Sequence, residues 1–410
     1  MNTVTRPVAQ RQYLAYACTC LFIVVLAGSP AAEPVHQWSQ RFGGPAGDVG
    51  QSVAVAADGT SVITGTFQDV ANFGGTDLTS AGSNDIFLAA FDANGTHLWS
   101  RAFGDTGNDE GLAVAIDASG HTIVTGRFFG NVDFGGGALT SAGLDIFVAK
   151  YDASGNHLWS GRFGGTGVDG GRGVTVDGSD NVIVVGSFQS AVDFGGGPLT
   201  SAGLDDIFVA KYDAGGSHLW SRRFGDTDVD SGRAVAVGAS NNVVMTGAFA
   251  GSVEFGGGTL TSAGMSDIFV ASYDATGTHL WSRHFGDGLS DAGEALAVDA
   301  NDDIVVSGAF QVSVDFGGAV LAGAGGDDIF LVKFAPDAGH VWSRSFGSLA
   351  SDIGLGVTVD TAGDVSITGQ FSSIIDLGGG PLTTNGSTDI FIAEYSENGT
   401  HLWSQGYGNT

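Results

Sequence analysis

The chain has 410 residues, 69 of them glycine, and a formal net charge of −29 at pH 7. Its 15 basic residues form no cluster, which argues against binding of nucleic acids or anionic membranes. Both cysteines, Cys18 and Cys20, come before residue 32, so the chain after that point can form neither disulfides nor thiolate metal sites.

Residues 1–31 have the pattern of a signal peptide. Arg6 and Arg11 occur without any acidic residue, "YLAYACTCLFIVVLAG" is an apolar core, and "SPAAEP" supplies small residues for cleavage. A retained membrane anchor is the alternative, but the apolar run is short for one, and no later run is long enough to span a membrane. We therefore expect export to the cell surface, the periplasm or the medium.

A repeat dominates the rest of the chain, residues 35–410. The seven tryptophans are spaced by 60 or 61 residues, and each has a histidine two positions before it and an aromatic residue four positions after it. A fixed period of this length is typical of repeat architectures. The tryptophans are Trp38, Trp99, Trp159, Trp220, Trp281, Trp342 and Trp403.

Each repeat contains four strand-like runs. In residues 171–224 these are "GVTVD", "NVIVVGSF", "DIFVAKYD" and "SHLWSRRFG", separated by short turns and by one longer connection between the second and third runs. Four antiparallel strands per repeat predict an all-β fold, a single β-propeller domain with six four-stranded blades. A β-helix has shorter repeats, and a β-sandwich of 61 residues would have little core. The repeats span about 39–99, 100–159, 160–220, 221–281, 282–342 and 343–403.

Seven tryptophan strands for six blades leave one strand over. We expect a strand from one terminus to close the ring by completing a blade that begins at the other terminus. The sequence does not indicate which terminus supplies it.

The stretch "GRGVTVDGSDNVIVVGSF", followed by "DIFVAKYD" and "HLWSRRFG", resembles the bacterial secreted β-propeller repeat (SBBP) family, and its layout is similar to NHL-type blades. The hairpin "VAKYDASGNHLW" also resembles the docking hairpin of quinoprotein propellers, although the vicinal cysteines of that family are missing. The resemblance implies the fold and an exported protein. It implies no particular activity, because propellers have many functions.

An aspartate follows each of the first six tryptophans by ten residues, just before the innermost strand of a blade. We expect these aspartates around the mouth of the central channel, where they either accept backbone N–H groups of their own loops or form a ring that binds cations such as calcium. The best single metal site is Asp226, Asp228 and Asp230, although Val237 stands where a calcium loop has a bidentate glutamate. No other cofactor is required. The six aspartates are Asp48, Asp109, Asp169, Asp230, Asp291 and Asp352.

Residues that break the repeat are the candidates for catalysis. Glu110, Glu294, Arg172 and Arg233 are singular residues near the same face, but no nucleophile elbow, metalloprotease motif or carboxylate pair accompanies them. We therefore interpret the chain as an exported, acidic and monomeric binding or scaffold module for a protein or glycan. The alternative is a secreted glycan hydrolase or lyase that uses the acidic face.

Overall fold

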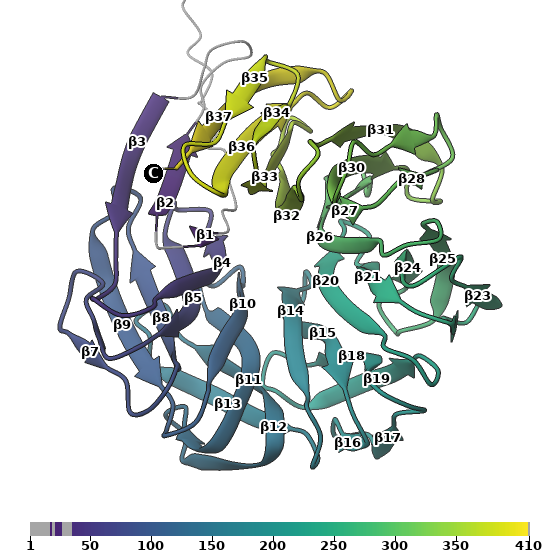
Figure 1. The fold of residues 1–410 in the computed structure, drawn as a ribbon. Helices are drawn as coiled ribbons and strands as arrows, with labels where there is room; N and C mark the ends of the chain where they lie inside the picture. Colours follow the sequence, from purple (N-terminus) through teal and green to yellow (C-terminus); the bar gives the residue numbers. More distant parts are fainter. Residues whose placement is uncertain (1–16, 19–20, 27–34, 409–410) are drawn as a thin grey trace, which may run out of the picture.

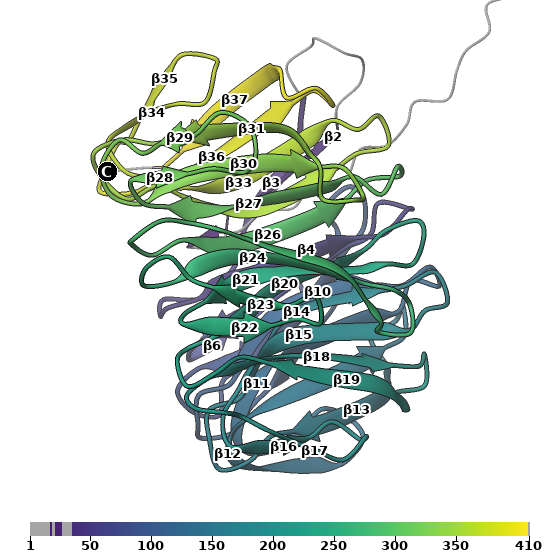
Figure 2. The same cartoon turned by 90° about the vertical axis from the view of Figure 1, so that its right-hand side faces the viewer.

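The computed structural model describes residues 17–18, 21–26 and 35–408, and every regular element in these residues is a β-strand. Six four-stranded antiparallel sheets stand around a common axis, as Figure 1 shows. The predicted all-β fold and the predicted number of blades are confirmed. Figure 2 shows the same ring from its side, with loops extending from its two faces.

The four strands of each blade follow one another in the chain, and the first strand lies nearest the axis. Blade 1 has β4 (Val49–Val55), β5 (Ser61–Phe67), β8 (Asp85–Phe91) and β9 (His97–Phe103). Blade 2 has β10 (Glu110–Ile116), β11 (Thr122–Asp133), β12 (Ala138–Tyr151) and β13 (His157–Phe163). Blade 3 has β14 (Gly170–Val176), β15 (Val182–Phe188), β18 (Asp206–Tyr212) and β19 (His218–Phe224). Blade 4 has β20 (Ser231–Val237), β21 (Val243–Phe249), β24 (Asp267–Tyr273) and β25 (His279–Phe285). Blade 5 has β26 (Ala292–Val298), β27 (Ile304–Phe310), β30 (Asp328–Phe334) and β31 (His340–Phe346). Blade 6 has β32 (Ile353–Val359), β33 (Val365–Phe371), β36 (Asp389–Tyr395) and β37 (His401–Tyr407).

The long connection between the second and third strands is itself a small hairpin. In blade 2 it is continuous with β11 and β12, and elsewhere it is a separate two-stranded sheet. A buried phenylalanine or leucine, such as Phe194, closes it onto the blade. The separate hairpins are β6 (Val70–Ala71) with β7 (Leu78–Thr79), β16 (Ala191–Asp193) with β17 (Pro198–Thr200), β22 (Ser252–Glu254) with β23 (Thr259–Thr261), β28 (Ser313–Val314) with β29 (Leu321–Ala322), and β34 (Ile374–Asp376) with β35 (Pro381–Thr383).

The hydrophobic core lies between neighbouring blades. Every residue of β15 and β18 is buried, because both faces of a blade are covered by the next sheets in the ring. Val185 and Ile207 of blade 3, for example, share one cluster with Met245 and Phe269 of blade 4. The apolar runs of the middle strands therefore reflect burial on both faces.

The prediction that a terminal strand completes a blade is wrong, because each of the six blades takes its four strands from one stretch of chain. The remaining tryptophan strand, β3 (Val35–Arg41), pairs with β2 (Leu21–Leu26), and β1 (Ala17–Cys18) adds to the inner edge of β4. Figure 1 shows these three strands between blades 6 and 1. The rest of residues 1–31, the predicted signal peptide, lies outside the described residues.

Strand β3 docks on blade 1 as the outer strands of blades 1 to 5 dock on the blade that follows each of them. Trp38 Nε1 donates to Ala93 O at 3.2 Å, in the turn before β9. Trp99 Nε1 of blade 1 donates in the same way to Ala153 O of blade 2 at 3.0 Å. Six of the seven tryptophans thus join a strand to the following blade, whereas Trp403 of β37 donates to Glu394 within its own blade.

Candidate functional site

The innermost strand of every blade carries a β-bulge at the same place. Its pairing with the second strand shifts register across one residue, which lies three positions after the repeated aspartate. A glycine precedes this residue in all six copies and a small residue follows it, while the bulged residue itself varies. A bulge re-aims the side chain that it displaces from the ladder. The six bulged residues are Gln51, Leu112, Arg172, Arg233, Glu294 and Leu355.

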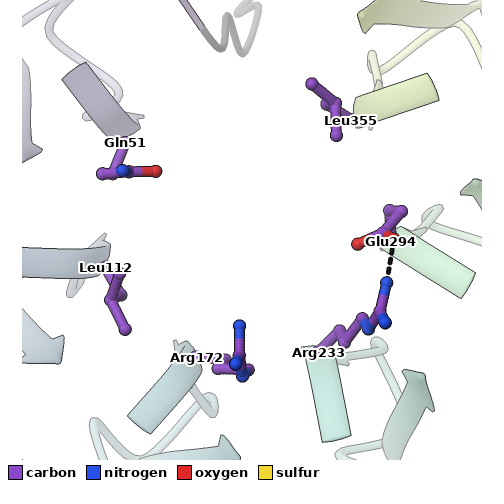
Figure 3. A pocket seen from close by; sticks show the side chains of 6 residues that line it. All are labelled: Gln51, Leu112, Arg172, Arg233, Glu294 and Leu355. Carbon is purple, nitrogen blue, oxygen red and sulfur yellow. Dashed lines mark hydrogen bonds and ion pairs between the residues drawn. The ribbon is translucent and has the colours of Figure 1, made fainter. Parts of the chain in front are cut away.

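These six side chains line one cavity of about 310 Å³ at the centre of the ring, which Figure 3 shows from close by. Its volume is at the lower end of the range for small-molecule sites, about 300–1,000 Å³. Each of the six blades contributes one of these side chains, from the equivalent position of its innermost strand. The cavity is nevertheless asymmetric, because the six residues include amide, apolar, basic and acidic side chains.

The charged residues of the cavity differ in how they are paired. Glu294 accepts a hydrogen bond from Arg233 across the boundary between blades 5 and 4, and the two form an ion pair. Arg172 has no hydrogen-bond or ion-pair partner among the residues that the structure describes. Figure 3 shows its guanidinium group pointing into the cavity.

Arg172 is exposed to the cavity, and the neighbouring residues of the ring surround its side chain. This enclosure lowers the pKa of its guanidinium group, and the positive charges of Arg233 and Arg127 lower it further. Glu294 and Asp205 oppose these effects from a distance. An arginine remains protonated at neutral pH, so Arg172 is a cation that faces the cavity without a partner among the described residues.

The sequence had singled out three of these residues as exceptions to the repeat, Arg172, Arg233 and Glu294, and the structure brings them together. The fourth, Glu110, forms an ion pair with Arg127 (Oε2 to Nη2, 2.8 Å). Sequence reasoning missed Gln51, Leu112 and Leu355. Comparing the third position after the aspartate in all six copies would have found them, because it is the one variable position between an invariant glycine and a small residue.

The six aspartates of the predicted ring are buried, with at most 8% of each residue exposed. In each, one carboxylate oxygen accepts the backbone N–H four residues earlier and the other accepts the backbone N–H twenty residues later, at 2.6–3.4 Å. One hydrogen bond of each pair lies within the aspartate's own loop, as the first of the two interpretations from the sequence expected, and the other joins this loop to the connection after the second strand. Burial raises the pKa of Asp230 to about 7 and that of Asp169 to about 6. Cation binding by the ring stays a prediction.

The structure places the three aspartates of the proposed single metal site in different surroundings. Asp230 is buried, Asp228 is exposed, and Asp226 accepts hydrogen bonds from the backbone N–H groups of Asp228 and Ser252. Within the described residues, the one group of three or more possible metal-ligating side chains whose ligand atoms all lie within 4.8 Å of one another is a different one: Asp360, Asp364 and Glu394. Calcium binding at residues 226–230 stays a prediction.

The three acidic residues Asp360, Asp364 and Glu394 belong to blade 6, and they come together because one repeat position there has an acidic residue in place of a basic one. Glu394 replaces a lysine that in three other blades forms a buried ion pair with the equivalent aspartate, as Lys211 does with Asp177 (2.7 Å). Glu394 also accepts a hydrogen bond from Trp403 Nε1. By itself an acidic group of this kind assigns no ligand.

A second row of buried aspartates was not predicted from the sequence. Its members begin the third strand in five blades, and Asp145 lies at the equivalent position within β12 of blade 2. Each accepts a backbone N–H three or four residues earlier, as Asp206 does from Ala202 at 2.9 Å. Arg162 and Arg223 form ion pairs with the members of blades 2 and 3. These contacts give the row a structural role. The members are Asp85, Asp145, Asp206, Asp267, Asp328 and Asp389.

The histidine row is also engaged in packing. Nε2 of His157 lies 3.0 Å from Ser160 Oγ, and the ring packs edge-on against Tyr151. A side chain at Gly136 of the connecting hairpin would collide with this ring, since its Cβ would lie 2.4 Å from a ring carbon. The row therefore holds the connecting hairpins on the outer strands.

No helix with the length and apolar character of a membrane span occurs among the described residues.

Comparisons with known proteins give two distant relatives. An uncharacterized WD repeat-containing protein of Acanthamoeba polyphaga mimivirus is 23% identical, over 94% of this chain and 35% of its own length. Regulatory protein FlaEY of Caulobacter vibrioides is 29% identical, over 43% of this chain and 20% of its own length. The chain thus matches about a third and a fifth of these relatives.

Solved structures give similar folds at low identity. A Bacteroides caccae protein of unknown function has a TM-score of 0.41 and 11% identity, covering 82% of this chain and 94% of that one. The WD40 domain of Pan2 from Neurospora crassa has a TM-score of 0.42 and 12% identity, with coverage of 85% and 83%. A gluconolactonase of Xanthomonas campestris has a TM-score of 0.37 and 14% identity, with coverage of 89% and 96%.

No family model matches the chain. The WD-repeat relative and the six-bladed ring support a β-propeller repeat protein.

Proposed function

We propose that this chain is an exported, non-catalytic β-propeller of the secreted bacterial repeat type, and that it binds a ligand in its central cavity. The observation that carries the proposal is the ring of bulged residues from Gln51 to Leu355. All six line one cavity, and they vary in chemical character, while the residue before each is a glycine and the residue after each is small.

The variation supports binding because it occurs at a position whose side chain lines the cavity in every blade. A residue that the fold needs recurs in every copy, as the tryptophans and the buried aspartates do. A binding site for one asymmetric ligand needs different groups at equivalent places. Catalysis would also need a positioned base, acid or nucleophile. The single carboxylate among the six lining residues, Glu294, is held by Arg233.

The test compares ligand binding by two variants, one that fills the cavity and one that changes an outer strand. Leu112→Trp should abolish binding of the ligands that the wild-type propeller selects from glycan and peptide arrays, because a large side chain would occupy the space at the axis. Leu158→Trp, on an outer strand where the leucine is 47% exposed, is the matched control and should bind as the wild type does.

Binding that persists in Leu112→Trp would contradict a site in the cavity. A turnover assay on the same ligands separates the two classes of function. Product formation that is lost in Glu294→Gln or Glu110→Gln would favour the glycan hydrolase or lyase.

Export makes a separate prediction. Intact-mass analysis of the protein recovered outside the cytoplasm should show a chain that begins near Ala32, because the apolar segment and the small residues after it form a cleavable signal. Recovery of the chain in the cytoplasm with Met1 as its first residue would contradict export.

A further inference from the structure

The cavity has the opposite charge to the surface of the protein. The chain is strongly acidic, but the six lining residues carry two arginines and one glutamate. Since Glu294 is paired with Arg233, the excess positive charge belongs to Arg172. We propose that Arg172 binds the carboxylate of a small molecule inside the central cavity. This inference rests on the proposed binding function and names its ligand class.

The neighbouring blade shows how such a group is satisfied. Arg233 occupies the equivalent bulge, and its guanidinium group meets a carboxylate, that of Glu294 in the next blade. Arg172 has the same backbone setting, but the residues on either side of it in the ring are Leu112 and Arg233. Neither can accept a hydrogen bond from it through its side chain. The structure thus presents one guanidinium with a carboxylate partner and one without.

Charge balance favours a carboxylate over a more highly charged anion. One carboxylate would neutralise the net charge of the six lining residues. A phosphate monoester carries up to two negative charges, and its second charge would find no cation in the cavity, since Arg233 is already paired. The planar guanidinium fork also matches the two oxygens of a carboxylate.

The acidic exterior does not prevent this. Charges farther away than about 8–10 Å are largely screened at physiological ionic strength, whereas the guanidinium acts at contact distance in a place that the blades partly shield from water. The long-range field does disfavour polyanions, which would approach many carboxylates at once. A small ligand with one negative charge is therefore the best match.

The other lining residues suit the body of such a ligand. Leu355 lies across the cavity from Arg172, and Leu112 lies next to it, as Figure 3 shows. Gln51 offers an amide that can donate or accept a hydrogen bond. The cavity therefore combines one charged contact, apolar surface and one polar contact, which is the usual composition of a small-molecule site.

The experiment compares small carboxylates with their neutral analogues by calorimetric titration of the propeller. The probes are acetate with acetamide, glucuronate with glucose, and N-acetylglycine with N-acetylglycinamide. We expect at least one carboxylate to bind and its neutral analogue not to bind. Glucuronate stands for a sugar acid and N-acetylglycine for the end of a peptide, so the preferred probe identifies the source of the carboxylate.

Three variants test the role of Arg172. Arg172→Gln should weaken binding of the preferred carboxylate at least tenfold. Glu294→Gln should strengthen it several-fold, because it releases the Arg233 guanidinium for the ligand, and a gain of affinity cannot come from misfolding. Arg222→Gln, at an exposed arginine on β19, is the matched control and should not change the affinity.

Equal affinity of Arg172→Gln and the wild type would overturn the inference, as would stronger binding of inorganic phosphate than of every carboxylate. If no carboxylate binds while Leu112→Trp still abolishes binding of another ligand, this inference fails and the proposed binding function stands.

Discussion

Gly247→Ala should destabilise the propeller by about 3 kcal/mol or more, because the new methyl group has no space. Its Cβ would lie 2.0 Å from the carbonyl oxygen of Ser231 and 2.9 Å from a ring carbon of Phe269. The first of these atoms belongs to the backbone, so the strands themselves must separate. Gly247 on β21 is paired with Gly232 on β20, directly before the bulge that carries Arg233.

The neighbouring residue provides the matched control. Ala248→Ser introduces the residue that blade 3 has at this position, Ser187, and should change the free energy of unfolding by less than about 1 kcal/mol. Urea denaturation of the two variants measures the difference. Equal urea midpoints for the two variants would show that the bulge does not require the backbone of Ser231 to lie so close to residue 247. The requirement is general, since all six blades have a glycine here whose Cβ would lie 1.9–2.1 Å from a backbone oxygen: Gly65, Gly126, Gly186, Gly247, Gly308 and Gly369.

The repeat predicted most of the fold because the residues that recur in every copy make the same contacts in every blade. The four strand-like runs in residues 171–224 correspond to β14, β15, β18 and β19, and the six copies correspond to the six blades. For the longer connection between the second and third strands, the sequence predicted no strands. Its hairpin was missed because short strands of two or three residues leave little periodicity in a sequence rich in glycine.

The prediction of ring closure failed for an identifiable reason. It assumed that every tryptophan strand belongs to a blade of the ring. Trp38 instead shows that the tryptophan motif reports docking onto the next blade's turn, through Ala93 and Gly95, and not membership of a complete sheet. Six of the seven tryptophans dock in this way, and Trp403 donates to Glu394 of its own blade instead.

The cavity could be predicted only in part. Arg172, Arg233 and Glu294 differ visibly from their repeat neighbours in character, so the sequence marked them. Their convergence depends on the register shift between Gly171 and Gly173 and its equivalents. Alternation along a regular strand does not reveal a bulge, and therefore the common direction of the six side chains had to come from the structure.

Asp169→Asn should destabilise the protein by about 1–3 kcal/mol at pH 5, because the side-chain amide nitrogen cannot accept a hydrogen bond from a backbone N–H. The two side-chain oxygens of Asp169 accept from Gly165 N at 2.9 Å and from Gln189 N at 2.8 Å, and the residue is fully buried. Asparagine can replace one of these two acceptors only. The exposed Asp193 is the matched control. It also accepts two backbone N–H groups, from Gly195 and Gly197, but water can replace it there, and Asp193→Asn should cost less than about 1 kcal/mol.

The pH dependence of this loss has a defined sign. Burial raises the pKa of Asp169 from its ordinary value of 3.8 to about 6, although its two backbone hydrogen bonds act in the opposite direction. Between these two values the folded protein binds more protons than the unfolded chain, so the stability contributed by this group is fully present below about pH 3.8 and is lost as the pH rises through 6. Burial acts in the same way on Asp109, Asp230 and Asp291, whose pKa values are raised to about 6, about 7 and about 6.

The wild type should therefore be more stable near pH 5 than near pH 8, and the difference in free energy of unfolding between wild type and Asp169→Asn should shrink over this interval. Urea titrations at pH 5, 6, 7 and 8 measure it. A difference that grows with pH would mean that the ionised carboxylate is the favoured form in the folded loop. That result would contradict a carboxylate dominated by burial, and it would be expected of one whose charge is compensated by its two backbone donors or by a bound cation. The titration thus also bears on the cation ring, because a cation held by the six aspartates would lower their pKa values and reverse the sign.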